Sequence, residues 1–287
     1  MSPAAPDHGA ERSVVRSRIA TRFAALKAEG RGALMPFLMA YDPDRATSLE
    51  MLRGLPAAGA DLIEIGMPFS DPMADGPTVQ LAGQRALKAG GSTAGVLAML
   101  REFRAGDDTT PVILMGYLNP VLSYGAERFC IDAAAAGADG VIMVDMPPEE
   151  SQELAPHAAA AGLDLIRLIA PTTNDARLPG VLRACSGFIY YVAITGITGT
   201  RSASAADLAL NIPRLRRFTD LPIAIGFGVR SPEQAAEAAR VADGAVVASA
   251  LIETMAATLS ASGAAGSGTA EAMLAHVRRL ASAVRAS

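Results

Sequence analysis

Short runs of consecutive apolar residues recur along the chain, and longer stretches with helical spacing of apolar positions separate them. Consecutive rather than alternating apolar residues are typical of parallel strands buried on both faces. The apolar runs span residues 33–40, 62–66, 112–118, 140–145, 165–170, 188–194, 222–228 and 244–250. Helical patterns lie between them, for example at residues 48–58, 127–136, 148–161 and 232–240. The sequence A-A-G-A-D begins at Ala57 and again at Ala135, which indicates weak repetition of one strand–helix unit.

This alternation predicts an α/β fold, a (β/α)8 TIM barrel, because eight strand–helix units fit within about 250 residues. An open, doubly wound sheet would use similar units and is the alternative. We expect an extra N-terminal helix at 13–29 and a C-terminal helix at 270–284, the latter after a Gly-, Ser- and Ala-rich linker at 260–269. Residues 1–12 are predicted to be a disordered leader, and residues 13–287 a single domain.

Charge and cysteine content exclude several classes of protein. The net charge is −4, whereas proteins that bind nucleic acid or anionic membrane surfaces usually carry a basic face. No apolar run reaches the ~18 residues that a membrane span needs. Cys130 and Cys185 form no C-x-x-C pair, so we expect reduced thiols and a cytoplasmic protein. The histidines are scattered without a nearby cluster of Cys or carboxylate side chains, so we expect no metal site.

Carboxyl groups near the second predicted strand are the first candidates for chemistry. Glu64 lies between Ile63 and Ile65 in that strand, and burial of an ionised carboxylate is costly, so its pKa should rise and suit proton donation. The alternative is a structural carboxylate paired with an arginine or with backbone amides. Asp71 and Asp75 lie in the proline-rich loop that follows, where a helix cap or a turn is the alternative interpretation.

Small residues near the last two predicted strands suggest an anion site. The seventh strand ends in Gly226-Phe227-Gly228 and the eighth in Ala248-Ser249-Ala250, and barrel phosphate sites are built after these two strands. The Gly-, Ser- and Thr-rich segment 195–204 follows the sixth strand and is either a mobile lid or an ordinary surface loop.

Several ordered motifs resemble one family. They are E-I-G-M-P-F-S-D-P-M-A-D-G-P-T at 64–78, M-G-Y-L-N-P at 115–120, V-D-M-P at 144–147, T-G-I-T-G at 195–199 and G-F-G-V-R-S-P-E-Q at 226–234. Together they resemble the tryptophan synthase alpha chain family over residues 18–285. The first motif also disfavours another phosphate-handling barrel such as an isomerase.

The resemblance implies a lyase that cleaves indole-3-glycerol phosphate to indole and glyceraldehyde 3-phosphate by a retro-aldol reaction, without a cofactor or a metal. It places the catalytic acid at Glu64, with a raised pKa, and a second carboxylate of ordinary pKa at Asp75. It also implies a tryptophan synthase beta chain as partner in an alpha2beta2 assembly, contacted by Asp71 and Pro147. The implied substrate-binding residues are Phe37, Met115, Ile142, Tyr190, Thr198, Gly199, Phe227, Gly228, Ala248 and Ser249.

The chain departs from the family pattern near the predicted site. Tyr41 and Ala248 stand where the family usually has glycine, and Ala193 stands where serine is common. These changes are either compensated by neighbouring residues, or they alter substrate size or phosphate binding. They also leave two further hypotheses open, a stand-alone indole-forming lyase and a non-catalytic subunit that regulates a partner.

Overall fold

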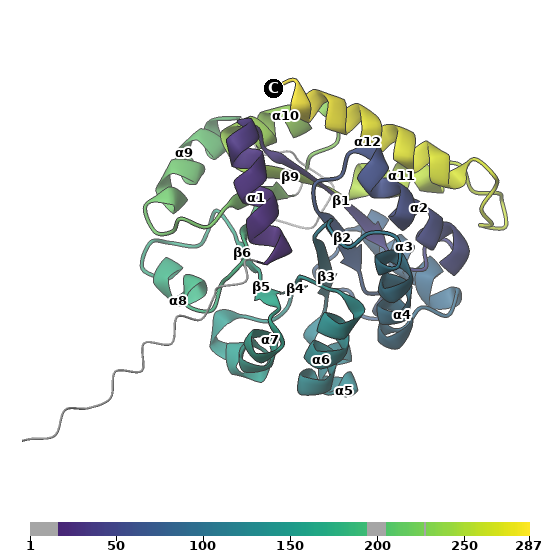
Figure 1. The fold of residues 1–287 in the computed structure, drawn as a ribbon, viewed down its shortest axis with the longest axis horizontal. Coiled ribbons are helices and arrows are strands. Elements are labelled where there is room, and N and C mark those ends of the chain that lie inside the picture. Colours follow the sequence, from purple (N-terminus) through teal and green to yellow (C-terminus); the bar gives the residue numbers. More distant parts are fainter. Residues whose placement is uncertain (1–16, 194–204, 227) are drawn as a thin grey trace, which may run out of the picture.

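The computed structural model describes residues 17–193, 205–226 and 228–287 and shows one parallel sheet surrounded by helices (Figure 1). The order of the strands in the sheet is β5-β4-β3-β2-β1-β9-β8-β7-β6. The strands are β1 Ala33–Met39, β2 Ile63–Gly66, β3 Val112–Gly116, β4 Gly140–Met143, β5 Asp164–Leu165, β6 Arg167–Ile169, β7 Ile189–Val192, β8 Ile223–Gly226 and β9 Gly244–Val247. The helices are α1 Arg18–Glu29, α2 Arg45–Ala58, α3 Pro77–Lys88, α4 Thr93–Arg104, α5 Leu118–Tyr124, α6 Ala126–Ala136, η1 Pro148–Glu153, α7 Ala155–Ala161, α8 Leu178–Leu182, α9 Ala205–Arg216, α10 Pro232–Val241, α11 Ser249–Ala256 and α12 Thr269–Arg285.

Two short strands, β5 and β6, close the sheet into a barrel. They stand at opposite ends of the strand order, yet only Ile166 separates them in the chain. The Ile166 N–H donates to the Val141 carbonyl over 3.0 Å, and the Ser186 N–H donates to the Leu165 carbonyl over 3.0 Å. The pair is therefore one interrupted barrel strand that bonds to both neighbours. The predicted (β/α)8 barrel is confirmed, and the open doubly wound sheet is excluded.

Most elements lie within a few residues of the predicted ranges, and the larger differences lie at the ends of β3 and β9 and in the predicted helix 148–161. The run 112–118 ends as a strand at Gly116, and α5 begins at Leu118. The run 244–250 ends as a strand at Val247, and Ser249 is already the first residue of α11. The predicted helix 148–161 is instead η1 followed by α7, because Pro156 has no N–H with which to continue the first helix.

The barrel interior is filled with apolar side chains, and α1 covers its N-terminal end (Figure 1). Ile19, Phe23 and Leu26 of α1 belong to the same buried cluster as the interior residues. The rings of Phe23 and Phe188 lie 5.8 Å apart between their centroids. A ligand-sized space is therefore expected at the C-terminal end of the strands, where barrel enzymes carry their sites. Within the described ranges, no helix is both long and apolar enough to cross a membrane.

Candidate active site

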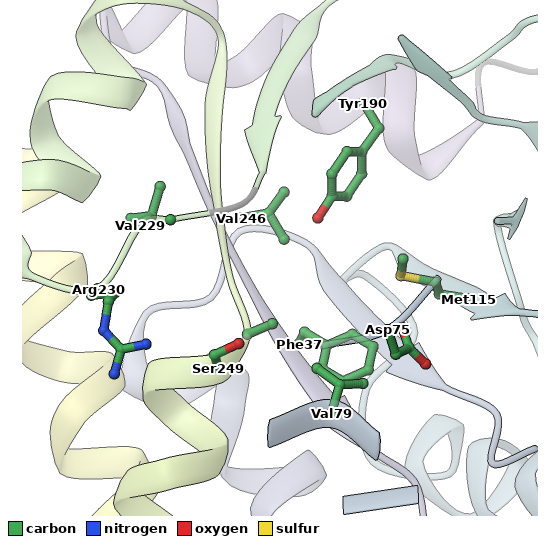
Figure 2. A pocket seen from close by; sticks show the side chains of 11 residues that line it. Phe37, Asp75, Val79, Met115, Tyr190, Val229, Arg230, Val246 and Ser249 are labelled. Carbon is green, nitrogen blue, oxygen red and sulfur yellow. The ribbon is translucent and has the colours of Figure 1, made fainter. Parts of the chain in front are cut away.

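A pocket opens at the C-terminal ends of the strands (Figure 2). Strands β1, β3, β7 and β9 contribute side chains to it, as do the segments that follow β2, β8 and β9. Its lining residues are Phe37, Asp75, Val79, Met115, Tyr190, Gly228, Val229, Arg230, Val246, Ala248 and Ser249. A Cβ atom at Gly66 would overlap the ring of Phe37, and one at Gly226 would overlap the ring of Tyr190. Both glycines therefore leave room for aromatic rings of the pocket.

Glu64 is a fully buried carboxyl group beside this pocket. It lies next to Phe37 of β1 in the strand register, is 0% exposed, and shares its side of β2 with Leu62 of the barrel interior. Neither carboxyl oxygen has a hydrogen-bond partner among the described residues, and burial raises the pKa of Glu64 to about 8. The alternative of an arginine-paired structural carboxylate thus finds no such arginine in the described part of the chain.

Tyr190 lies close to both candidate carboxyl groups. Its ring is buried and its hydroxyl points into the pocket in Figure 2. The pKa of Tyr190 is raised well above its ordinary value, first by burial and then by the charges of Glu64 and Asp75. Because a charge acts strongly only over short distances in a protein, these three groups form one cluster.

Asp75 is held by the loop between β2 and α3. The Ala74 N–H donates to the hydroxyl oxygen of Tyr117 over 3.0 Å, and the Tyr117 hydroxyl bonds to the Asp75 carboxylate. Burial raises the pKa of Asp75 to about 6, although the bond from Tyr117 opposes that rise. The expectation of an ordinary pKa is therefore wrong, because the loop desolvates this side chain. The N-cap of α3 is Gly76, so Asp75 is not the helix cap that its Asp-Gly sequence allows.

The other end of the pocket has the features of an anion site. Gly228 takes a positive φ of 85°, and α11 begins at Ser249 without a capping side-chain hydrogen bond. The first N–H groups of a helix favour an anion. Arg230 also lines this end, and its guanidinium pairs with Glu253 of α11.

The residues predicted from sequence fall into three groups. Those that line the pocket are Phe37, Asp75, Met115, Tyr190, Gly228, Ala248 and Ser249. Glu64 and Ile142 are fully buried in the barrel and do not line the pocket itself. Thr198, Gly199 and Phe227 lie outside the described residues, as does the predicted lid at 195–204. Asp71 and Pro147 are exposed on loops at the C-terminal side of β2 and β4.

Sequence reasoning missed some residues of the site. Val79, Val229, Arg230 and Val246 line the pocket, and Tyr117 holds the Asp75 loop. Arg230 and Tyr117 occur inside quoted motifs, G-F-G-V-R-S and M-G-Y-L-N-P, so their positions at strand ends were the available signal. Val79 and Val246 carry no such signal, because valine is expected in any apolar strand or helix face.

Two departures from the family pattern lie away from the pocket. Tyr41 has a φ of 69°, in the left-handed region that favours glycine, but its hydroxyl lies against Gly95 of α4. Neither Tyr41 nor Ala193 lines the described pocket. Ala248 does line it, with a negative φ of −118° that any residue adopts. Of the three departures, Ala248 is therefore the one placed to affect a ligand.

Comparisons with known proteins agree on one family. The family model described as tryptophan synthase alpha chain matches residues 23–284. The tryptophan synthase alpha chain of Granulibacter bethesdensis is 66% identical over 94% of this chain and 96% of its own length. That of Acidiphilium cryptum is 64% identical over 94% of this chain and 98% of its own length.

Solved structures give the same answer. The crystal structure of tryptophan synthase subunit alpha from Legionella pneumophila str. Paris has a TM-score of 0.85 and 36% identity, over 94% of this chain and 99% of that one. A chain of Mycobacterium tuberculosis tryptophan synthase has a TM-score of 0.82 and 34% identity, over 94% of this chain and 98% of that one. The chain belongs to the tryptophan synthase alpha chain family.

Proposed function

We propose that Glu64 and Asp75 catalyse the cleavage of indole-3-glycerol phosphate, the lyase reaction of tryptophan synthase alpha chains. The observation that carries this assignment is the Glu64 carboxyl, which is fully buried, has no partner among the described residues and has a pKa of about 8. A carboxyl group in that state is protonated at neutral pH and is ready to donate.

The reaction needs a proton on the indole ring before the carbon–carbon bond can break. In the proposed mechanism Glu64 protonates the ring carbon that bears the glycerol chain, and ionised Asp75 accepts a hydrogen bond from the indole N–H of the resulting cation. The electron pair of the breaking bond then returns to the ring. The neighbouring hydroxyl becomes the aldehyde of glyceraldehyde 3-phosphate, and its proton returns to the Glu64 carboxylate, so the acid is regenerated.

The shape of the pocket supports the orientation of the substrate. Figure 2 shows Phe37, Met115 and Asp75 on one side, suited to an indole ring, and Ser249 on the other. Gly228 and the N-terminus of α11 are suited to the phosphate. Binding the phosphate away from the reacting carbon orients the substrate for proton transfer. The resemblance of their motifs also assigns Thr198, Gly199 and Phe227, which lie outside the described residues, to substrate binding.

The chain works in tryptophan biosynthesis with a tryptophan synthase beta chain, and we propose that the loops with Asp71 and Pro147 contact that partner. Both residues are exposed, and Met73 beside Asp71 is 76% exposed although it is apolar. An exposed apolar side chain on a stiff loop suits a protein interface.

Both cysteines are free, which fits a cytoplasmic protein.

The test is an assay of indole release from indole-3-glycerol phosphate, with and without an added beta chain. We expect Glu64→Gln to lower turnover by about a thousandfold, within the range for loss of a general acid, and to leave binding of a substrate analogue intact. Glu102→Gln, which removes an exposed carboxylate, is the matched control. If Glu64→Gln kept a tenth of the activity or more, Glu64 would not be the acid. Equal activity with and without the beta chain would favour the stand-alone lyase.

The two pKa values also predict a pH profile. Activity needs ionised Asp75 and protonated Glu64, so it should rise as pH increases through about 6 and fall as pH increases through about 8. Tyr190 faces both groups, and it stays protonated across that range because its pKa is far higher. A rate that is flat between pH 5 and 9 would contradict the assigned roles.

A further inference from the structure

We infer that Arg230 recognises the phosphate of the substrate and that Glu253 competes with the phosphate for its guanidinium. This inference rests on the proposed function, because it specifies how the anion end of the same pocket works. Arg230 is the cationic residue among the described residues that line the pocket.

The charges of the pocket are divided between its two ends. Asp75 stands with Phe37 and Met115 at one end, whereas Arg230 stands with Ser249 at the other in Figure 2. A ligand with an N–H group at one end and an anion at the other matches this division. Backbone N–H groups alone supply only partial charge, whereas a guanidinium binds phosphate oxygens with two parallel donors.

Glu253 holds Arg230 at the edge of the pocket. One carboxylate oxygen of Glu253 pairs with Nη2 of Arg230, and the other accepts a hydrogen bond from the Thr78 hydroxyl over 3.0 Å. The backbone N–H of Arg230 donates to Gln234 over 2.8 Å, which fixes where the side chain begins. The start of the arginine side chain is therefore fixed, while its guanidinium keeps further donors for a second anion.

The ion pair is weak enough for a phosphate to displace it. The side chains of Arg230 and Glu253 are 45% and 41% exposed, and solvent-exposed ion pairs contribute little to stability. A phosphate dianion carries more charge than a carboxylate and offers bidentate geometry to arginine. The charge of Glu253 also repels an anion at this end of the pocket. Removal of that charge should therefore strengthen phosphate binding, whereas removal of Arg230 should weaken it.

The experiment measures binding of inorganic phosphate by calorimetry and steady-state cleavage of indole-3-glycerol phosphate. We expect Arg230→Gln to raise KM and the phosphate Kd by about tenfold, the equivalent of about 1.4 kcal/mol, and to lower kcat by a smaller factor. Glu253→Gln should lower both constants by about threefold. The matched control is Arg240→Gln, which breaks the exposed Arg240–Glu237 pair of α10 at the opposite end of the barrel, and it should change neither constant.

Further arms separate this inference from the proposed function. Arg230→Gln should slow cleavage of indole-glycerol, which lacks the phosphate, much less than it slows cleavage of the phosphorylated substrate. Arg230→Lys should have an intermediate phosphate Kd because it keeps the charge but not the bidentate geometry. An unchanged phosphate Kd in Arg230→Gln overturns the inference, as does a weaker phosphate affinity in Glu253→Gln. Phosphate binding that depends on Arg230 in a chain that releases no indole would overturn the proposed function alone.

Discussion

The carboxylates at the N-terminal end of the barrel differ from Glu64, beside the pocket, in what surrounds them. Asp61, just before β2, accepts the Leu34 N–H over 2.9 Å and pairs with Arg22 and Arg31. Glu64, three positions further along the chain, has no partner among the described residues. Two acids that lie three positions apart in the sequence therefore differ in whether they have partners.

The same paired arrangement recurs around the N-terminal end. Asp139, just before β4, accepts the Val112 N–H over 2.7 Å and pairs with Arg18 and Arg104 over 2.9 and 2.8 Å. Asp243, just before β9, accepts an N–H from Ile223 of β8 over 2.7 Å. Each aspartate accepts an N–H from the first or second residue of the neighbouring strand, so each one joins two neighbouring strands near their start.

This recurrence gives the A-A-G-A-D repeat a physical meaning. Gly59 and Gly137 end their helices with positive φ values of 106° and 93°, and Asp61 and Asp139 are the last residues of the two copies. The repeat therefore encodes the end of a helix followed by a strand clamp, which is an aspartate that hydrogen-bonds to the neighbouring strand. The comparison teaches that the aspartates just before β2 and β4 serve stability through arginine pairs, whereas Glu64, further along β2, keeps a carboxyl group without a partner among the described residues and so available for chemistry.

The largest expected effect on stability is that of removing one strand clamp. Asp61→Asn should lower the free energy of unfolding by about 3 kcal/mol, because the partly buried Arg22 and Arg31 lose the buried charge that both pair with, and it should leave kcat within about twofold. Urea denaturation and the indole assay measure the two quantities. Glu29→Gln removes the exposed carboxylate on the same Arg31 and should cost much less. Equal costs for the two variants would break the comparison at this end.

A second test asks whether unpaired Glu64 strains the fold. Its pKa is 4.5 in an unfolded chain and about 8 in the folded one, so both states are protonated below 4.5, and the unfolded state is increasingly favoured as pH rises towards 8. Glu64→Gln removes that penalty. It should therefore stabilise the chain by a few kcal/mol at pH 8 relative to pH 5, since one pKa unit corresponds to about 1.4 kcal/mol.

Urea denaturation at both pH values measures this gain. Glu102→Gln is again the control, because the Arg45 guanidinium lowers rather than raises the pKa of Glu102, so its substitution should give no gain as pH rises. A Glu64→Gln variant that is equally stabilised at pH 5 and pH 8 would show that Glu64 ionises freely in the folded chain.

The smallest expected effect concerns the hydroxyl of Tyr117. Tyr117→Phe keeps the ring that packs 5.2 Å from Phe69 but removes the hydrogen bond that lowers the pKa of Asp75. The acid limb of the pH–rate profile should move to higher pH, and kcat should fall by about tenfold at most. Asp145 and Asp75 are the charges that act on Tyr117, and both remain in the variant.

Tyr124→Phe provides the matched control for that variant. It removes a tyrosine–aspartate hydrogen bond of 2.6 Å to Asp132 between α5 and α6, away from the pocket. Its pH–rate profile should stay unchanged. An unshifted acid limb in Tyr117→Phe would show that the Asp75 loop keeps its place without this hydroxyl.

Most of the barrel could be predicted from sequence, because strands buried on both faces leave continuous apolar runs. The place and raised pKa of Glu64 followed from the same pattern, since its neighbours in the strand are apolar. The strand end at Val247 could not be predicted, because an Ala-Ser-Ala sequence suits both a strand and the first turn of α11.

Contacts between segments that are distant in the sequence could not be predicted either. The Tyr117 hydroxyl meets the Asp75 loop from the end of β3, and the Arg230–Glu253–Thr78 chain joins three separate segments. Such contacts depend on how loops converge at one end of the barrel, and spacing within one sequence does not contain that information. The raised pKa of Asp75 was missed for the same reason, because its burial comes from neighbours in space.

The packing of α1 against the barrel interior limits how substrate enters the site and how product leaves it. Phe23 and Leu26 close the N-terminal end of the barrel beneath the interior side chains. In the described part of the chain the pocket is therefore open at one end only, and no tunnel runs along the barrel axis. Substrate entry and product exit then share the mouth of the pocket at the C-terminal ends of the strands. A protein seated over that mouth would govern both the arrival of one molecule and the departure of the next.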